Sequence, residues 1–228
     1  MLYLVATPIG NLEDMTIRAI RVLKEVDLIL AEDTRKTGLL LAHFDIHKPL
    51  RPFFDHNEAQ EVPRIIEELR QAKNIALASS AGTPTICDPG YKLVRACRKE
   101  KLEITAIPGC SSVINAVTLS GLPHDKFVFL GYLPRKDGAR RKVLGKAVGM
   151  EAALVFLESP FRLIKSLESL KRVLPGCPVT ICREMTKKFE EVFEGTVEEA
   201  GSYFKRHGPK GEFTIVVGRP ACRPGRPE

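Results

Sequence analysis

Through the first half of the chain, short apolar runs alternate with segments whose apolar residues recur at helical spacing. The runs predict strands over residues 2–5, 27–31, 74–79 and 103–107. The helical segments cover residues 16–26, 37–43, 57–72, 90–101 and 111–120. Strands that alternate with helices in short units predict an α/β domain built on a mostly parallel sheet.

Helix ends in this half carry residues suited to capping. Asn57 can cap the helix over 57–72, and Asp88 with Pro89 supplies an N-cap and a first-turn proline for the helix over 90–101. In the helix over 16–26, one apolar face is predicted to consist of Ile17, Ile20, Leu23 and Val26.

The second half has a different pattern. Strands are predicted over residues 127–133, 153–157, 179–183 and 213–217, and helices over 160–173 and 196–204. Residues 187–195 can form a hairpin with the strand before them, and Thr196 with Glu199 forms a capping box. We therefore expect two α/β domains, 1–122 and 123–228, the second with a mixed sheet.

Composition excludes several classes of protein. Of 228 residues, 44% are hydrophobic and 28% charged, as in globular domains. The uncharged stretch 104–123 contains Pro108 and Gly109, so it is not a membrane span, and the N-terminus lacks the features of a signal peptide. The six cysteines have no paired spacing and no histidine cluster beside them. We expect a cytoplasmic protein with reduced cysteines and no metal site.

Small residues follow four successive strands of the first domain. Parallel strands present their carboxyl ends at one edge of a sheet, where α/β proteins bind ligands. Loops rich in glycine, proline and serine at four such ends favour a shared ligand cleft, although glycine and proline also simply form turns. Neither a dinucleotide fingerprint nor a P-loop is present, so the loops are of an uncommon kind.

Seven ordered motifs carry a resemblance to a known family. They are VATPIGNLED (5–14), AEDTR (31–35), DHNE (55–58), AGTP (81–84) with DPG (88–90), PG (108–109), GYLP (131–134) and REMTK (183–187). Together they resemble the bacterial ribosomal RNA small subunit methyltransferase I family, within the tetrapyrrole methylase superfamily. The resemblance runs from Leu2 to about Val217.

The resemblance implies a reaction and a binding mode. It implies S-adenosyl-L-methionine bound in the cleft between the two domains of a homodimer, and 2′-O-methylation of a cytidine in the decoding centre of 16S ribosomal RNA, within the small subunit. The residues that it implies for cofactor contact are Pro8, Ala81, Gly82, Thr83, Ile86, Ser111, Ser112, Glu158 and Met185.

The chain departs from the family pattern at two places. Ser80 stands where the family usually has aspartate, which puts in doubt any role that needs a charge there. Longer members continue into a helical extension, whereas this chain ends at Glu228. We expect the core to hold the RNA.

Ribose methylation needs a base or a group that stabilises the developing oxyanion. The bases that the motif loops offer are Glu32, Asp33, Asp55, His56, Asp88 and Glu184, and the cations are Arg35, Arg183 and Lys187. The predicted catalytic set is Asp33, Arg35, Glu184 and His56. Asp33 could instead cap the next helix, and Arg183 with Glu184 could be an exposed ion pair.

The net charge of +7 lies entirely in the second half. Residues 135–146 alone hold six cations and one acid. We predict that RNA phosphates bind Arg135, Lys136, Arg140, Arg141 and Lys142, although such a stretch can also be a solvated helix face. With fifteen aromatic residues and no tryptophan, base stacking is expected to be limited.

Three other functions stay open. A corrin or porphyrin C-methyltransferase would share the fold and the cofactor. A metal-dependent nucleotide hydrolase is suggested by Glu58 and Glu61 with Glu67 and Glu68 on one helix, but no second carboxylate-rich helix is evident. A non-catalytic RNA-binding module is supported by charge alone.

Overall fold

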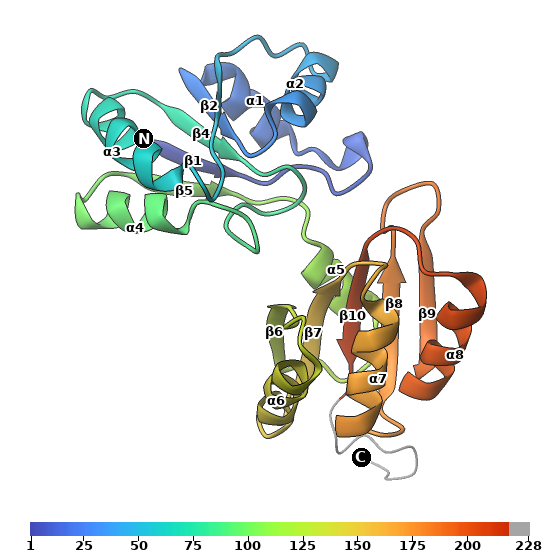
Figure 1. Ribbon diagram of the computed structural model, residues 1–228. Helices are drawn as coiled ribbons and strands as arrows, with labels where there is room; N and C mark the ends of the chain where they lie inside the picture. The colour runs from blue at the N-terminus through green and yellow to red at the C-terminus, as the bar shows by residue number, and fades with distance from the viewer. Residues whose placement is uncertain (219–228) are drawn as a thin grey trace. The chain divides into compact units, whose positions relative to one another are not determined.

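The computed structural model describes residues 1–218, which form two compact units (Figure 1). The first unit is residues 1–111, and the second begins at Ser112. Helix α5 (Ser112–Leu119) packs against strands of the second unit, so the units divide before this helix rather than at the predicted boundary after residue 122. Cys222 and the tail that ends at Glu228 lie outside the described residues.

The first unit is built on a five-stranded parallel sheet. Its strands are β1 (Leu2–Val5), β2 (Leu28–Ala31), β3 (Leu50–Pro52), β4 (Ile75–Ala78) and β5 (Ile104–Ile107), in the order β3-β2-β4-β1-β5. β1 lies between β4 and β5, with Leu2 opposite both Ile75 and Ile104. The predicted α/β class with a parallel first sheet is confirmed; the short edge strand β3 was not predicted.

Helices cover both faces of this sheet. They are α1 (Ile17–Glu25), α2 (Thr34–His43), α3 (Glu58–Arg70) and α4 (Tyr91–Lys99), with a short 3₁₀ helix, η1 (Leu12–Asp14). One apolar cluster joins α1 and α2 to the sheet, and a second joins α3 and α4 to it. The predicted inward face of α1 is wrong at Ile17, which is 87% exposed; Ala19 and Val22 face the sheet together with the predicted Leu23.

Two predicted helix caps are also wrong. Asn57 makes no side-chain bond to α3; its amide accepts from Phe54 N (2.8 Å) and donates to Pro52 O (2.8 Å). Helix α4 is capped from a distance: the buried Glu58 carboxylate accepts from the backbone N–H groups of Gly90 (3.2 Å) and Lys92 (3.0 Å). Asp88, the expected cap, instead accepts a hydrogen bond from Ser79 Oγ.

The second unit has a five-stranded mixed sheet. Its strands are β6 (Phe127–Tyr132), β7 (Ala153–Glu158), β8 (Pro178–Arg183), β9 (Glu191–Thr196) and β10 (Phe213–Val217), in the order β6-β7-β10-β8-β9. Only β6 and β7 are parallel neighbours. The predicted mixed sheet, the β8–β9 hairpin and the capping box of Thr196 and Glu199 are confirmed.

Three helices cover one face of this sheet side by side: α6 (Asp137–Val148), α7 (Leu163–Val173) and α8 (Val197–His207). They share one apolar core with the strands (Figure 1). Helix α5 covers the other face, where Thr180 Oγ1 donates to Ser120 O (2.9 Å). Most of the basic stretch 135–146 lies in helix α6.

Candidate functional site

The loops after β1, β4 and β5 are joined to one another at the carboxyl edge of the first sheet. Thr7 and Gly82 exchange two backbone hydrogen bonds of 3.0 Å each, and the buried Thr7 hydroxyl donates to Ser79 O (3.0 Å). Thr83 Oγ1 donates to Cys110 O (3.0 Å). The structure thus places three loops predicted to hold a ligand side by side.

Two glycines allow this close approach. A Cβ atom at Gly109 would lie 2.9 Å from Ala6 Cβ, and one at Gly82 would lie 3.3 Å from Ile9 Cγ2. Gly82 also has a φ of +82°, which favours glycine. Side chains at these two positions would therefore force the loops after β1, β4 and β5 apart.

The predicted cofactor residues of the first unit gather on these loops. Pro8 and Gly82 are buried, whereas Ala81, Thr83 and Ile86 are exposed. In the same β4–α4 loop, Thr85 (φ +71°) and Cys87 (φ +63°) are non-glycine residues in the left-handed region. Each such residue costs about 1–3 kcal/mol, and strain of this kind is concentrated at ligand sites.

Ser111 and Ser112, the last predicted residues on this edge, span the division between the two units. Ser111 ends the first unit, and Ser112 begins helix α5 of the second. Both side chains are half-buried.

A second feature of this edge is a surface cavity of about 540 Å³. It is lined by Glu32, Asp33, Thr34, Arg35, Lys36, Pro52, Phe54 and Ser80. Two of the four predicted catalytic residues, Asp33 and Arg35, therefore lie in one cavity. His56 is exposed and lies in the turn after β3, the same turn that supplies Phe54.

Asp33 caps helix α2, which was the structural alternative to a catalytic role. Its Oδ1 accepts from Lys36 N (3.3 Å) and Arg35 N (3.0 Å), and these hydrogen bonds, first that from Lys36, lower the pKa of Asp33. A carboxylate stabilised in its charged form is a poor proton acceptor. The Arg35 side chain is 93% exposed, and its Nε lies 3.8 Å from Asp33 Oδ1 in a surface ion pair.

Asp88 is a half-buried titratable group on this edge. Burial raises the pKa of Asp88; the hydrogen bond from Ser79 opposes the rise, and the nearby charges of Glu32 and Asp55 add to it. Sequence reasoning missed this environment, because the Asp-Pro pair resembles an ordinary helix start.

In the second unit, Glu184 and Met185 lie in the turn after β8, where Glu184 (φ +49°) and Thr186 (φ +65°) are in the left-handed region. Burial alone would raise the pKa of Glu184, but hydrogen bonds from Lys187 Nζ (3.0 Å) and Glu212 N (2.9 Å) hold it below its usual value. The side chain therefore fixes the turn, and Met185 is buried beside it.

Arg183 and Glu184 are not a simple exposed pair. Arg183 donates to Lys210 O (2.7 Å) and to Glu191 Oε2 (2.7 Å), while Glu184 has the partners given above. The structure thus excludes the exposed ion pair that was the alternative for these two residues.

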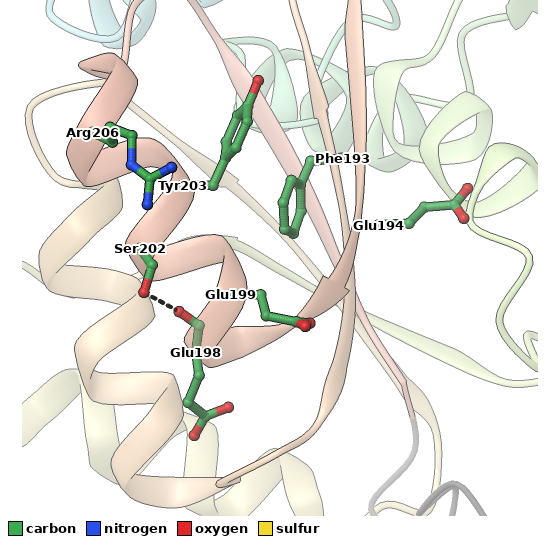
Figure 2. A pocket seen from close by; sticks show the side chains of 7 residues that line it. All are labelled: Phe193, Glu194, Glu198, Glu199, Ser202, Tyr203 and Arg206. Carbon is green, nitrogen blue, oxygen red and sulfur yellow. Dashed lines mark hydrogen bonds between the residues drawn. The ribbon is translucent and has the colours of Figure 1, made fainter.

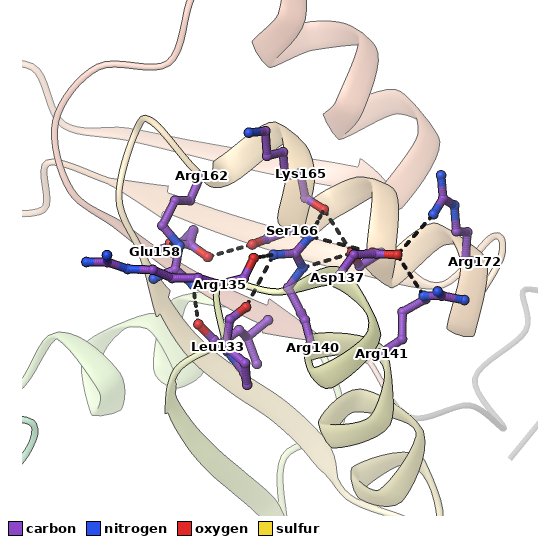
Figure 3. A network of polar contacts seen from close by, with 12 residues as sticks. Leu133, Arg135, Asp137, Arg140, Arg141, Glu158, Arg162, Lys165, Ser166 and Arg172 are labelled. Carbon is purple, nitrogen blue, oxygen red and sulfur yellow. Dashed lines mark hydrogen bonds and ion pairs between the residues drawn. The ribbon is translucent and has the colours of Figure 1, made fainter.

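Glu158, the other predicted cofactor residue of this unit, is buried with its carboxylate fully engaged (Figure 3). It accepts from Ser159 N (2.9 Å) and Ser166 Oγ (2.5 Å) and forms an ion pair with Arg162 Nε (3.2 Å). A cofactor contact at this position would have to come from the backbone.

The structure contradicts one predicted RNA contact. Arg140 is buried, and its guanidinium donates to Ser169 Oγ (2.8 Å) and to three carbonyl oxygens, those of Pro134 (3.3 Å), Arg135 (3.1 Å) and Lys165 (3.1 Å) (Figure 3). A guanidinium committed in this way cannot bind a phosphate, so the prediction for Arg140 is wrong. Arg135, Lys136, Arg141 and Lys142 are exposed, as a phosphate contact requires.

A further surface cavity, of about 480 Å³, lies over α8 and β9 (Figure 2). Its lining includes Glu194, Glu198 and Glu199, with Arg206 the one cation among the lining residues. Glu199 is held by the capping box and Glu198 accepts from Gly176 N (3.3 Å). Its acidic lining does not suit a polyanion.

Residues 1–218 contain neither a metal cluster nor a membrane-spanning helix. No group of three His, Cys, Asp or Glu side chains in this range is placed to hold a metal ion. Within the same residues, no helix is long and apolar enough to cross a membrane.

Comparison with solved structures identifies the fold. The methyltransferase CobJ superposes with a TM-score of 0.72 at 18% identity, covering 100% of this chain and 96% of that one. The uroporphyrin-III C-methyl transferase of Thermus thermophilus, in complex with S-adenosylhomocysteine, superposes with a TM-score of 0.65 at 20% identity, covering 96% and 97%. These likenesses establish the shared fold.

Comparison of sequences is more specific. The family model for Tetrapyrrole (Corrin/Porphyrin) Methylases matches residues 1–201. Ribosomal RNA small subunit methyltransferase I of Halalkalibacterium halodurans is 48% identical over 216 residues, 95% of this chain and 75% of that protein. The protein of that name from Thermotoga maritima is 46% identical, over 95% of this chain and 97% of that one. The chain therefore belongs to the tetrapyrrole methylase family and, within it, to the ribosomal RNA small subunit methyltransferase I group.

Proposed function

We propose that this protein is an S-adenosylmethionine-dependent methyltransferase that methylates the 2′-hydroxyl of a cytidine in the decoding centre of 16S ribosomal RNA. The observation that carries the proposal is the identity of 41–48% to relatives named ribosomal RNA small subunit methyltransferase I. Action on the small subunit would take place in the cytoplasm, and we propose that the protein acts as a homodimer.

The residues present fit the cofactor. Among the described side chains, Ser80 Oγ and Thr186 Oγ1 are buried without a hydrogen-bond partner. Each is the direct neighbour of a predicted cofactor residue, Ala81 and Met185 respectively. Buried polar atoms are rarely left unpaired, so each of these hydroxyls, in its own unit, is a candidate hydrogen-bond partner for a polar ligand. The hydroxyl of Ser80 is therefore suited to a neutral hydrogen bond where the family usually has a carboxylate.

Backbone would supply most of the contacts. Loops that carry Pro8, Ala81, Gly82 and Thr83 would present main-chain groups to adenine and ribose, and Ile86 would offer an apolar surface. Ser111, Ser112, Met185 and the Glu158 turn complete the proposed set. When bound, S-adenosylmethionine supplies a methyl group on a positively charged sulfur, which is already activated for transfer.

The chain must supply the activation of the ribose. Transfer forms a carbon–oxygen bond at the 2′-oxygen and breaks a carbon–sulfur bond, and a base takes up the hydroxyl proton. We assign Arg35 to stabilise the developing negative charge and His56 to accept the proton. Asp33 and Glu184, whose pKa values are lowered, act as positioning residues: Asp33 orders the start of α2 beneath Arg35, and Glu184 fixes the Met185 turn.

The test is a map of ribose methylation on small-subunit RNA from cells with and without this protein. A single cytidine that loses its 2′-O-methyl group in the deletion strain, and regains it when purified protein and S-adenosylmethionine are added to the isolated subunits, is the expected result. An unchanged methylation map would overturn the proposal. Methyl transfer to a corrin or porphyrin, measured in parallel, would favour the alternative substrate class.

A further inference from the structure

Two turns of the second unit are held together by the guanidinium groups of Arg140, which is buried, and Arg162, which is half-buried (Figure 3). β6 and β7 are parallel neighbours, so the turns that follow them meet at one edge of the sheet. Arg162, in the turn after β7, donates to Leu133 O in the turn after β6 and is itself fixed by buried Glu158. Arg140 adds a second link, since it bonds both Arg135 O and Lys165 O.

One large apolar side chain beside these links, that of Phe161, is exposed to solvent. Phe161, directly before Arg162, is 91% exposed. It lies within two residues of the Arg162–Leu133 contact, as does Arg135. An aromatic ring displayed on a fixed turn loses little conformational freedom when a flat group stacks on it.

The charges around Phe161 are positive. Arg135, Lys136 and Lys165 are exposed. The nearby acids are occupied: Glu158 is buried, Asp137 is paired with Arg141 (3.0 Å) and Arg172 (3.3 Å), and Glu168 with Lys205 (3.4 Å). This surface is therefore complementary to a polyanion that also carries aromatic rings.

We infer that Phe161 is a stacking platform for an unpaired base of the RNA substrate, flanked by phosphate contacts from Arg135 and Lys136. The inference rests on the proposed function and extends it from backbone binding to a specific base contact. Stacking of single-stranded bases on exposed aromatic side chains is a common mode of RNA recognition. It also revises the expectation, drawn from the low aromatic content, that stacking is limited.

The experiment measures binding of the whole protein to two probes across a range of salt concentrations. The probes are small ribosomal subunits from the deletion strain and a single-stranded oligonucleotide of the methylated segment. Phe161→Ala is expected to weaken binding by about 5- to 150-fold without changing the salt slope, and Phe161→Trp to retain it. Arg135→Gln with Lys136→Gln is expected to reduce the slope by about 1.4 on the oligonucleotide.

The matched control is Ile17→Ala, which truncates an equally exposed apolar residue in the first unit. It should bind both probes like the wild type, and unfolding midpoints should show that all variants are folded. Unchanged affinity of Phe161→Ala would overturn the platform, as would an equal loss for Ile17→Ala. A changed molecular mass of Phe161→Ala in solution would assign the residue to contact with a second copy instead.

Methyl transfer is measured separately from binding. If the wild type transfers methyl groups but Phe161→Ala binds RNA as tightly as the wild type, the stacking platform is overturned and the proposed function stands. Phe161-dependent binding without any transfer would support the platform and overturn the proposed function. A wild type that binds neither probe would overturn both.

Discussion

The Glu58 carboxylate at the start of α3 caps the neighbouring helix α4, through the backbone N–H groups of Gly90 and Lys92. This contact joins two helices that cover the same face of the first sheet. Position 90 requires glycine, because its φ is +128° and a Cβ atom added there would lie only 2.6 Å from Leu77 Cδ2. The β4–α4 loop is thus held at its far end by a residue 32 positions earlier in the chain.

Replacement of Glu58 by alanine should destabilise the first unit by about 1–3 kcal/mol, because helix N–H groups lose their partner in a buried setting. Urea unfolding followed by circular dichroism measures the loss. The control is Glu67→Ala on the same helix, whose carboxylate is more than half exposed and pairs only at the surface. We expect a change of about 0.5 kcal/mol or less for the control; equal effects in both variants would contradict the capping role.

Arg140 and Arg141 are adjacent on α6, and we expect the first to matter for stability and the second for RNA binding. Arg140→Ala should cost about 3–5 kcal/mol of stability, because the carbonyl groups of three residues and the Ser169 hydroxyl lose a buried partner. Arg141→Ala should change stability by at most about 1 kcal/mol and instead weaken RNA binding, with a smaller salt slope. Unfolding curves and filter binding separate the two roles, and a stable Arg140→Ala protein with weakened RNA binding would reverse the assignment.

A side chain at position 109 should damage cofactor binding. Gly109→Ala places a methyl group 2.9 Å from Ala6 Cβ and pushes apart the loops after β1 and β5. We expect this variant to bind S-adenosylmethionine more weakly, with the dissociation constant raised about tenfold for each 1.4 kcal/mol of strain. Isothermal titration calorimetry measures the change. Gly138→Ala is the control, since its added Cβ meets no atom within 4 Å. Wild-type affinity in Gly109→Ala would show that the loop spacing does not matter.

Arg35→Gln should lower kcat by about 100- to 1000-fold, the scale of removing one donor to a developing oxyanion, while the affinity for S-adenosylmethionine is unchanged. His56→Ala should lower kcat by about 100- to 10,000-fold. Lys99→Gln, an exposed change at the end of α4, is the control. Full activity of either Arg35→Gln or His56→Ala would remove that residue from the proposed mechanism.

The raised pKa of Asp88 makes stability depend on pH. The folded protein binds the Asp88 proton more tightly than the unfolded chain, where the pKa is near 3.8, so stability falls as pH rises from that value through the folded-state pKa. Asp88→Asn, which stays neutral and can still accept from Ser79, should flatten this part of the profile. Unfolding measured between about pH 4 and pH 7 checks it, with Glu13→Gln as an exposed control. A profile parallel to that of the wild type would contradict the assignment.

Local patterns predicted most of the strands and helices, because apolar runs such as Leu2–Val5 and the capping box at Thr196 are signals carried by neighbouring residues. The edge strand Leu50–Pro52 escaped prediction, since three residues that include arginine and proline carry no such signal. Ile17 was misplaced because the buried face of α1 extends toward Ala19 and Val22, beside the predicted Leu23.

The site was predictable where it depends on motif order, and less so where it depends on distant contacts. Neighbouring parallel strands end at the same edge of a sheet, so the loops that follow β1 and β4 lie side by side and Thr7 pairs with Gly82. Burial of Arg140 depends on carbonyl groups of other segments, so within the sequence it looks like its exposed neighbours. Phe161 was likewise not singled out from the sequence, although its side chain is 91% exposed.

The central place of β1 has a consequence for synthesis of the chain. Its two edges are covered by β4 and β5, which end at residues 78 and 107. Both edges of β1 are therefore paired only after the chain has been synthesised as far as Ile107, and until then at least one edge of the strand has unpaired backbone. Correct folding of the first unit therefore requires that residues 2–5 do not pair with another chain during that interval.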